Sequence, residues 1–244
     1  AAFLRSRKPE AGAMTVKRSP IQHRFLDQNY VIAEHNAYDM ASLLSNEKAE
    51  KESIKRLALC DLSSFNRAGF RGRNIAPWFE QQHNIVLPAV NQALMTEDGL
   101  LVSCLSHTEV LLLEDIDSAG DGFTSILNKT GTDSISTEHP EIYYLPRQTS
   151  HSCFFTSGEY CARLFSKLCG VDLRTGKFSN MSIVQTSLAR ASVIIIRRDL
   201  NETPGYFILN DSSLTEYLWD CLLDAMQEFE GNIVGFSHFI KPVS

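Results

Sequence analysis

Two stretches of this 244-residue chain, 59–114 and 151–209, show the same order of sequence patterns. Each stretch begins with a strand-like apolar run, continues with a short amphipathic helix and ends with two more strand-like runs. A β-α-β-β unit of this size cannot bury its apolar face alone, so the pattern predicts an α+β protein in which two diverged β-α-β-β repeats pack as one body. The predicted helix and strand pair are 74–83, 100–105 and 109–113 in the first stretch, and 160–169, 183–188 and 192–197 in the second.

The composition between the two stretches marks a boundary. Residues 117–147 are rich in Ser, Thr, Gly and Asp, which favour turns and loops. We therefore predict a first α+β half over 20–128, a linker over 129–150 and a second α+β half over 151–244. Residues 1–19 hold five basic side chains and one acidic side chain, which indicates a flexible basic arm. A targeting peptide is the alternative for this arm, although it lacks the apolar core of a secretory signal.

Charge and composition exclude several classes of protein. With 43% hydrophobic residues the chain can build a globular core, and its net charge of −6 disfavours nucleic acid as a partner, because phosphate contacts require a concentrated basic surface. No run of residues reaches the roughly 18 uncharged apolar positions of a membrane span, which argues against a membrane partner. Six cysteines without a C-x-x-C pair indicate free thiols in a reducing cytoplasm, and the scattered histidines predict no metal site.

Common enzyme motifs are missing from the sequence. The glycines of 69–72 and 120–122 lack the third glycine and the helix context of phosphate and dinucleotide sites, and no nucleophile elbow is present. The carboxylates of 114–117 follow an apolar strand and run into a loop, so we interpret them as solvated charges at a strand end, with a cation site as the alternative. The sequence therefore points to no familiar catalytic centre.

The best-marked helix lies near the carboxyl end. Ser213 and Glu216 have the spacing of a capping box, which predicts that a helix begins there. Apolar residues at steps of three and four continue to Phe229, and Gly231 is the expected terminator. Trp219 lies off this apolar stripe, so we expect it at a boundary or an interface.

A series of short phrases carries a resemblance to a known family. They are 18–21, 59–63, 69–72, 87–88, 98–102 and 105–112 in the first half, and 183–189, 194–198, 205–209 and 217–225 in the second. In this order they resemble the gamma subunit of heterotetrameric sarcosine oxidase and, more distantly, the glycine-cleavage T-protein (aminomethyltransferase) family. The resemblance implies an α+β, aminomethyltransferase-like body with a folate-binding fold, built from repeated β-α-β-β elements.

The resemblance also implies that the chain has lost a catalytic group. The T-protein family carries its catalytic acid in a strand segment of the form Gly-Gly-Ile-Ile-Asp-Asp, which corresponds here to 98–103. Val102 and Ser103 stand at the acid positions. A valine cannot transfer a proton or stabilise an iminium cation, so no residue of this chain is expected to be catalytic.

Three residues are candidates for binding folate through the resemblance. The family's folate-binding glutamate precedes a Gly-Phe-Glu-Ile strand, and Glu202 is its counterpart here, with the spacing shifted by one residue. Tyr206 and Arg197 are the other two candidates, because a pterin requires a carboxylate for its amino and ring nitrogens together with aromatic or apolar walls. The alternative is that 201–204 forms only a polar hairpin tip.

The resemblance implies a non-catalytic accessory subunit of a flavin-dependent sarcosine (N-methyl amino acid) oxidase-like complex in folate-linked one-carbon metabolism. FAD or FMN would lie on larger flavoprotein subunits of the hetero-oligomer, and this chain would hold no cofactor firmly, although tetrahydrofolate is a candidate ligand. Trp78, Phe79 and Trp219 are the candidates for the subunit interface. The alternative is a stand-alone tetrahydrofolate-dependent aminomethyltransferase or folate-binding protein. A folate-binding maintenance protein for iron–sulfur clusters ranks last, because 167–170 matches its motif only superficially.

Overall fold

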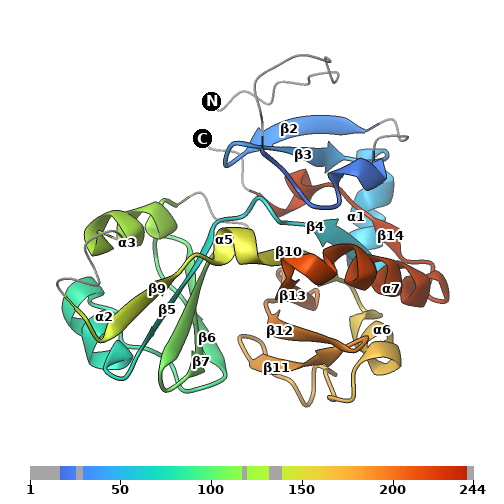
Figure 1. Cartoon of the computed structure of the whole chain (residues 1–244). Coiled ribbons are helices and arrows are strands. Elements are labelled where there is room, and N and C mark those ends of the chain that lie inside the picture. The colour runs from blue at the N-terminus through green and yellow to red at the C-terminus, as the bar shows by residue number, and fades with distance from the viewer. Residues whose placement is uncertain (1–16, 26–29, 117–119, 132–138, 241–244) are drawn as a thin grey trace.

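The computed structural model describes residues 17–25, 30–116, 120–131 and 139–240. Within these residues the strands form three sheets, and helices cover the outer faces of the two larger ones (Figure 1). The smallest sheet has the order β1-β3-β2 and lies at the top of the view, beside helix α1 (Glu47–Arg56). Its strands are β1 (Lys17–Arg18), β2 (Val31–His35) and β3 (Tyr38–Leu43).

The six-stranded sheet forms the right side of the molecule in Figure 1 and has the order β11-β12-β13-β10-β4-β14. Its central strands are rich in β-branched and aromatic residues, which favour strands buried on both faces. Helices α6 (Cys161–Leu168) and α7 (Thr215–Gln227) pack on its outer face. Its strands are β4 (Ala58–Asp61), β10 (His151–Ser157), β11 (Ile183–Leu188), β12 (Ala191–Arg197), β13 (Gly205–Asp211) and β14 (Asn232–Ile233).

The five-stranded sheet forms the left side and has the order β6-β7-β8-β5-β9. Helices α2 (Ile75–His83) and α3 (Gly122–Thr130) cover its outer face, and the short helix α5 (Arg147–Ser150) connects it to the six-stranded sheet. None of the helices in the described residues is long and apolar enough to cross a membrane. The strands of the five-stranded sheet are β5 (Arg67–Gly72), β6 (Gln92–Met95), β7 (Leu100–Ser106), β8 (Glu109–Glu114) and β9 (Ile142–Leu145).

Three hydrophobic cores follow from this arrangement. One lies between the six-stranded sheet and helices α6 and α7, and another between the five-stranded sheet and helices α2 and α3. The third lies between the two sheets, where Phe65, Leu101 and Leu111 meet Phe155 and Phe207. Alternate residues of a strand face opposite sides, so each central strand supplies side chains to two cores.

The predicted α+β class is confirmed, whereas the predicted repeat is not. The predicted elements are found in the expected order, as β5-α2-β7-β8 and β10-α6-β11-β12, but the first stretch also contains β4 and β6. Their strands pair differently: β8 pairs directly with β5, but β13 lies between β12 and β10. The two stretches therefore share an order of elements without a common strand order.

The sheets divide the chain differently from the predicted halves. Strand β4, which comes from the predicted first half, pairs with β10 from the predicted second half. The predicted linker over 129–150 contains β9 and α5. Of the predicted basic arm, Lys17 and Arg18 form β1 and pair with β3, and the part before residue 17 lies outside the described residues. The domain boundaries thus stay a prediction, and the two larger sheets give the better description of the fold.

Helix α7 forms where the apolar periodicity predicts it, but its start differs in detail. Asp211 Oδ1 accepts hydrogen bonds from the backbone N–H of Ser213 at 2.9 Å and from its hydroxyl at 2.6 Å. A 3₁₀ turn over Ser212–Leu214 then leads into the helix. The residue before α7 is Leu214, and no side chain caps this start; the Ser213 hydroxyl donates to the aspartate at the end of β13.

Candidate functional site

The two positions that match the family's catalytic acid lie in the middle of strand β7, and neither carries a carboxylate. Val102 is fully buried beneath helices α2 and α3. Ser103 points to the other side, into the core between the two sheets, where its hydroxyl has no hydrogen-bond partner among the described residues. Apolar and aromatic side chains occupy the space around it. The geometry therefore offers no proton-transferring group at this position.

Two of the three folate candidates are brought together, and both are engaged inside the chain. Arg197 and Tyr206 lie directly opposite each other on β12 and β13, 7% and 0% exposed. The Arg197 guanidinium donates to Asp199 at 2.9 and 2.7 Å and to the carbonyl of Thr175 at 3.0 Å. The Tyr206 hydroxyl donates to the carbonyl of Leu173 at 2.8 Å, and burial raises the pKa of this phenol. Both side chains hold the segment before β11 against the sheet.

Glu202, the third folate candidate, lies apart from the other two. It is exposed in the turn between β12 and β13, and its carboxylate makes no hydrogen bond or ion pair with the described residues. The preceding Asn201 has a φ of 55°, which is the left-handed conformation that asparagine tolerates in tight turns. The arrangement has the form of a polar hairpin tip, and a folate-binding role for Glu202 remains a proposal.

The three aromatic side chains predicted for a subunit interface lie in the chain's own cores. Trp78 and Phe79 belong to helix α2 and are 5% and 0% exposed, and both rings pack against Phe70. Trp219 is 1% exposed and packs edge-on against Phe25 at a centroid distance of 5.9 Å. These side chains pack in the chain's own cores, and a role for them at a subunit interface stays a prediction.

A surface cavity of about 380 Å³ lies on the six-stranded sheet near the start of β10. Its lining combines polar side chains with apolar ones from four adjacent strands, in the mixture typical of small-ligand sites. Gln185 donates its amide N–H to the carbonyl of Leu105 at 2.8 Å, so this wall is tied to the five-stranded sheet. The lining residues are His151, Gln185, Thr186, Ser192, Val193, Ile194 and Leu209.

His151 is the titratable group of this cavity, and its neighbours keep it neutral. Arg147 donates one N–H to Glu109 and another to Nε2 of His151, the latter at 2.9 Å. A guanidinium can only donate, so Nε2 accepts and the ring proton is on Nδ1, which donates to the Ser150 hydroxyl at 2.8 Å. Burial and the charges of Arg147 and Arg67 lower the pKa of His151 to about 4. With its lone pair taken by a cation, this imidazole is a poor general base at neutral pH.

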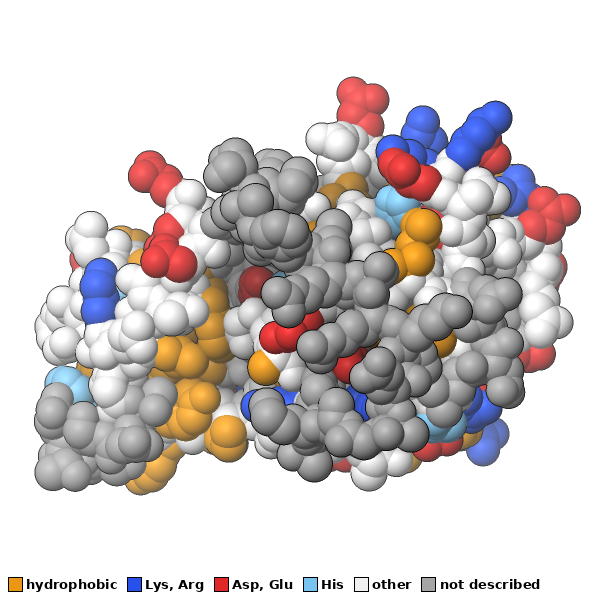
Figure 2. Space-filling model, turned by 90° about the horizontal axis from the view of Figure 1, so that it is seen from above, with side chains coloured by type: hydrophobic (Ala, Val, Ile, Leu, Met, Phe, Trp, Pro, Cys, Tyr) orange, Lys and Arg blue, Asp and Glu red, His pale blue; other side chains and the backbone are white. Residues whose placement is uncertain are grey.

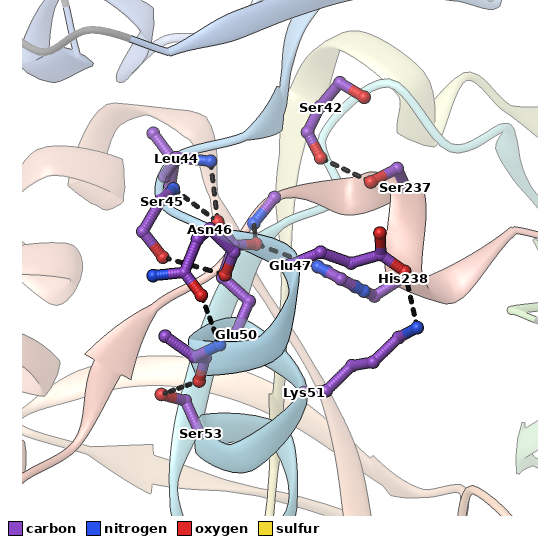
Figure 3. Close-up of polar contacts among 12 residues, drawn as sticks. Ser42, Leu44, Ser45, Asn46, Glu47, Glu50, Lys51, Ser53, Ser237 and His238 are labelled. Atoms are coloured by element: carbon purple, nitrogen blue, oxygen red, sulfur yellow. Dashed lines mark hydrogen bonds and ion pairs between the residues drawn. The ribbon is translucent and has the colours of Figure 1, made fainter.

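A second polar cluster surrounds Glu50 on helix α1 (Figure 3). This carboxylate is 1% exposed and accepts the backbone N–H groups of Leu44, Ser45 and Gly235 at 2.7, 2.6 and 2.8 Å. The Nε2 atom of His238 lies 3.0 Å from its second oxygen. Burial acts to raise the pKa of Glu50, but these hydrogen bonds outweigh it and hold the pKa below its usual range. The cluster fastens the C-terminal segment to α1.

Ser64, His35 and Glu114 form a third cluster, in the order of a nucleophilic triad. Ser64 Oγ lies 3.0 Å from Nδ1 of His35, and Nε2 of that ring lies 3.4 Å from Oε1 of Glu114. Ser64 is fully buried, so no substrate can reach its hydroxyl. Asn36 donates to the same glutamate at 2.6 Å and to the carbonyl of Ser64 at 3.1 Å. The cluster therefore docks the β2–β3 turn onto the five-stranded sheet.

Asp61 is a buried carboxyl to which the sequence analysis gave no role. Its Oδ1 accepts the N–H of Ser63 at 3.0 Å, but Oδ2 has no hydrogen-bond partner among the described residues. Burial raises its pKa, a property that general acids share. The sequence signal was a charged residue directly after the apolar run 57–60, at the end of a buried strand. At 6% exposure Asp61 is enclosed by the fold. Within the described residues no group of three or more His, Cys, Asp or Glu side chains is placed to hold a metal ion.

Comparisons with solved structures place this fold. One chain of the heterotetrameric sarcosine oxidase from Corynebacterium sp. U-96, solved in complex with pyrrole 2-carboxylate, superposes with a TM-score of 0.63 at 22% sequence identity. The match covers 89% of this chain and 98% of that one. Aminomethyltransferase T of the glycine cleavage system from Bartonella henselae superposes with a TM-score of 0.70 at 13% identity. The chain shares the fold of both proteins.

The extent of the two matches differs. The match to aminomethyltransferase T covers 91% of this chain but only 60% of the enzyme, so the chain spans less than two thirds of that enzyme's length. No family model and no curated protein matches the sequence. The predicted resemblance in fold is therefore confirmed by structure, whereas activity and partners do not follow from identities this low.

Proposed function

We propose that this chain is a non-catalytic accessory subunit of a hetero-oligomeric, flavin-dependent oxidase that acts on sarcosine or related N-methylated amino acids. The observation that carries the proposal is the match over 98% of one chain of a heterotetrameric sarcosine oxidase. In this reading the flavin and the oxidation chemistry belong to larger partner subunits, and this chain contributes to assembly.

The polar groups of the chain support a structural role. At the acid positions of β7, Val102 and Ser103 cannot transfer a proton to a substrate amine. His151 is neutral and its lone pair accepts from Arg147, while the Ser64 hydroxyl is sealed from solvent. Each group that resembles catalytic machinery is thus either engaged or inaccessible, as expected of a subunit that positions others.

Purification from the native cells tests the proposal. The full-length chain is tagged, isolated under gentle conditions, and examined for visible absorption, subunit masses and oxidation of sarcosine. We expect a larger flavin-bearing chain in stoichiometric amount, and we expect the Ser64→Ala variant to leave turnover per flavin unchanged. A colourless chain that purifies alone contradicts the proposal.

The likeness to aminomethyltransferase T favours a second candidate, a stand-alone tetrahydrofolate-dependent protein with Glu202 as the pterin ligand. Calorimetric titration of the purified chain with tetrahydrofolate separates the two. The second candidate requires saturable binding that Glu202→Ala abolishes, while Glu52→Ala, at an exposed glutamate of helix α1, leaves it intact. The accessory-subunit proposal expects the same heat traces from all three proteins.

A further inference from the structure

One rim of the five-stranded sheet combines two exposed arginines with an exposed tyrosine and the edge strand β9. A groove of about 530 Å³ lies where β5 ends and β9 begins. Arg71 and Arg73 line it, and both are exposed. Neither forms an ion pair or hydrogen bond with the described residues. We call this groove the β9 rim, and its lining residues are Arg71, Gly72, Arg73, Thr108, Glu141 and Tyr143.

A neighbouring arginine of the same strand is bonded within the chain instead. Arg67 lies on the same strand and the same face as Arg71, but it is 2% exposed. Its guanidinium donates to the carbonyls of Ser63 at 3.0 Å and Phe65 at 2.8 Å. The guanidinium group at one end of β5, that of Arg67, is thus hydrogen-bonded within the chain. Those of Arg71 and Arg73 at the other end are exposed to solvent. Glu141 is the one acidic residue in the lining, and Glu109, which lies opposite Arg71 on β8, is paired with Arg147. The rim is therefore net positive in a chain whose overall charge is −6.

The backbone of β9 also has unused hydrogen-bonding capacity. The N–H of Gly72 donates to the carbonyl of Thr108 at 2.9 Å. In β5 the backbone N–H and C=O groups of even-numbered residues therefore point toward β8, and those of odd-numbered residues point toward β9. Arg71 and Gly69 are therefore hydrogen-bonded to their opposite residues on β9, Tyr143 and Leu145. The N–H and C=O of Tyr144 then point to the outer edge, where β9 pairs with no strand of the described residues.

The same rim exposes apolar surface. Tyr143 lies directly opposite Arg71 and is 59% exposed, and Tyr144 and Leu145 are half-buried. Figure 2 shows hydrophobic side chains gathered on the left of the molecule, the side of the five-stranded sheet, and a cluster of charged side chains at the upper right. Pro140 and Pro146 flank the strand and limit pairing along its edge to a few residues, which disfavours open-ended association between copies of the chain.

We infer that the β9 rim binds a short, extended, acidic segment of a partner chain. Carboxylates of the segment pair with Arg71 and Arg73, its backbone pairs with the free edge at Tyr144, and an apolar residue packs on Tyr143. This is strand addition to a sheet edge, with charge selecting the partner. The inference deepens the proposed function and rests on it, since the rim becomes the surface by which the accessory subunit holds its larger partner.

The first test uses a defined probe and the purified full-length chain. The probe is a fluorescein-labelled synthetic peptide in which glutamate and valine alternate, and the control peptide has lysine in place of glutamate. We expect the acidic peptide alone to bind, and Arg71→Glu with Arg73→Glu to weaken it at least about tenfold, as reversal of two interfacial charges does. The matched control is Lys48→Glu with Lys55→Glu, which reverses two exposed cations on helix α1, away from β9, that form no ion pair with the described residues.

Equal binding of both peptides, or equal loss in both double variants, overturns the inference, because either result would reflect nonspecific attraction. Absence of any binding of the acidic peptide overturns it as well. This test is independent of whether a flavoprotein partner exists.

The second test uses the complex from native cells. A photo-crosslinking amino acid replaces Tyr143 in the tagged chain, and the crosslinked peptides are identified by mass spectrometry. An acidic segment of the flavin-bearing chain supports the inference, and co-purification that survives Arg71→Glu with Arg73→Glu overturns it while leaving the proposed function intact. A chain that purifies alone defeats the proposed function, and the peptide test then decides the inference by itself.

Discussion

The surroundings of Glu50 and the β9 rim show two ways in which the molecule treats charge. Glu50 is buried, and four donors meet its two oxygens: three backbone N–H groups and the ring of His238. Arg71 and Arg73 at the rim are exposed and meet no described partner. The Glu50 carboxylate holds the C-terminal segment to helix α1, whereas the two arginines are exposed to solvent.

The difference separates charges that stabilise the chain from charges that are available to another molecule. A buried carboxylate is tolerated only when hydrogen bonds replace its lost hydration, so removing the charge disturbs the fold. An exposed arginine without a partner adds almost nothing to stability, and its interaction energy is free for a ligand. Asp61 lies between these cases, since it is buried but only one of its oxygens is paired.

The largest expected effect is from Glu50→Gln. In one orientation the NH₂ group of the amide faces the backbone N–H groups of Leu44 and Ser45, and in the other it faces the N–H of Gly235. We expect a loss of about 3 kcal/mol in the free energy of unfolding, the size typical of a broken buried charge network. Urea denaturation followed by circular dichroism measures it.

Glu52→Gln is the matched control, because Glu52 is an exposed glutamate of the same helix. It is expected to change the free energy of unfolding by less than about 0.5 kcal/mol. Similar losses in the two variants would show that the hydrogen bonds to Glu50 do not stabilise the fold. Glu50 would then no longer differ from the rim arginines in its contribution to stability.

An intermediate effect, with a distinct pH dependence, is expected from Asp61→Asn. Burial raises the pKa of Asp61, so the folded chain binds its proton more tightly than the unfolded chain, and stability falls as pH rises through the folded pKa. Asparagine keeps an acceptor for Ser63 N–H and cannot ionise. We expect the variant to be more stable than wild type by about 1 kcal/mol at neutral pH, with the advantage vanishing below the unfolded aspartate pKa of about 3.9.

Glu50 supplies the opposite sign in the same measurement. Its pKa is lowered in the folded chain, so its stabilising contribution is present above the unfolded glutamate pKa and is lost as pH falls through the folded pKa. Unfolding free energies of wild type, Glu50→Gln and Asp61→Asn across the acid range therefore separate the two carboxyls. If Asp61→Asn is less stable than wild type at neutral pH, the unpaired oxygen of Asp61 does not destabilise the fold. Asp61 then stabilises the chain as Glu50 does, and it no longer lies between Glu50 and the rim arginines.

Local patterns in the sequence predicted the helices and strands more successfully than their pairing. Helices expected over 74–83 and 160–169 were found at Ile75–His83 and Cys161–Leu168, because apolar periodicity is a short-range property. Strand β4 pairs with β10 nearly a hundred positions later, and the pattern of neither strand encodes that choice. The repeat was inferred from the order of elements, and order alone does not determine which strands become neighbours.

The candidate sites show the same limit at the level of side chains. The resemblance marked Arg197 and Tyr206 as candidates for binding folate, but the sequence could not show that they would hydrogen-bond to Asp199 and to the carbonyl of Leu173. Trp78 and Trp219 were interpreted as interface residues, and only the packed structure shows that the chain's own cores enclose them. In contrast, the absence of a carboxylate at Val102 and Ser103 is a matter of residue identity and was visible in the sequence.

The smallest expected effect on stability is at the rim. Arg71→Ala combined with Arg73→Ala removes two exposed side chains with no described partner, so we expect the free energy of unfolding to change by less than about 0.5 kcal/mol. Urea denaturation of this variant beside Glu50→Gln tests the comparison directly. A loss of unfolding free energy as large as that of Glu50→Gln would mean that the two arginines stabilise the fold. An unchanged free energy of unfolding means that the charge of the two arginines is available to a partner. The crosslinking experiment at Tyr143 then identifies the partner that binds there.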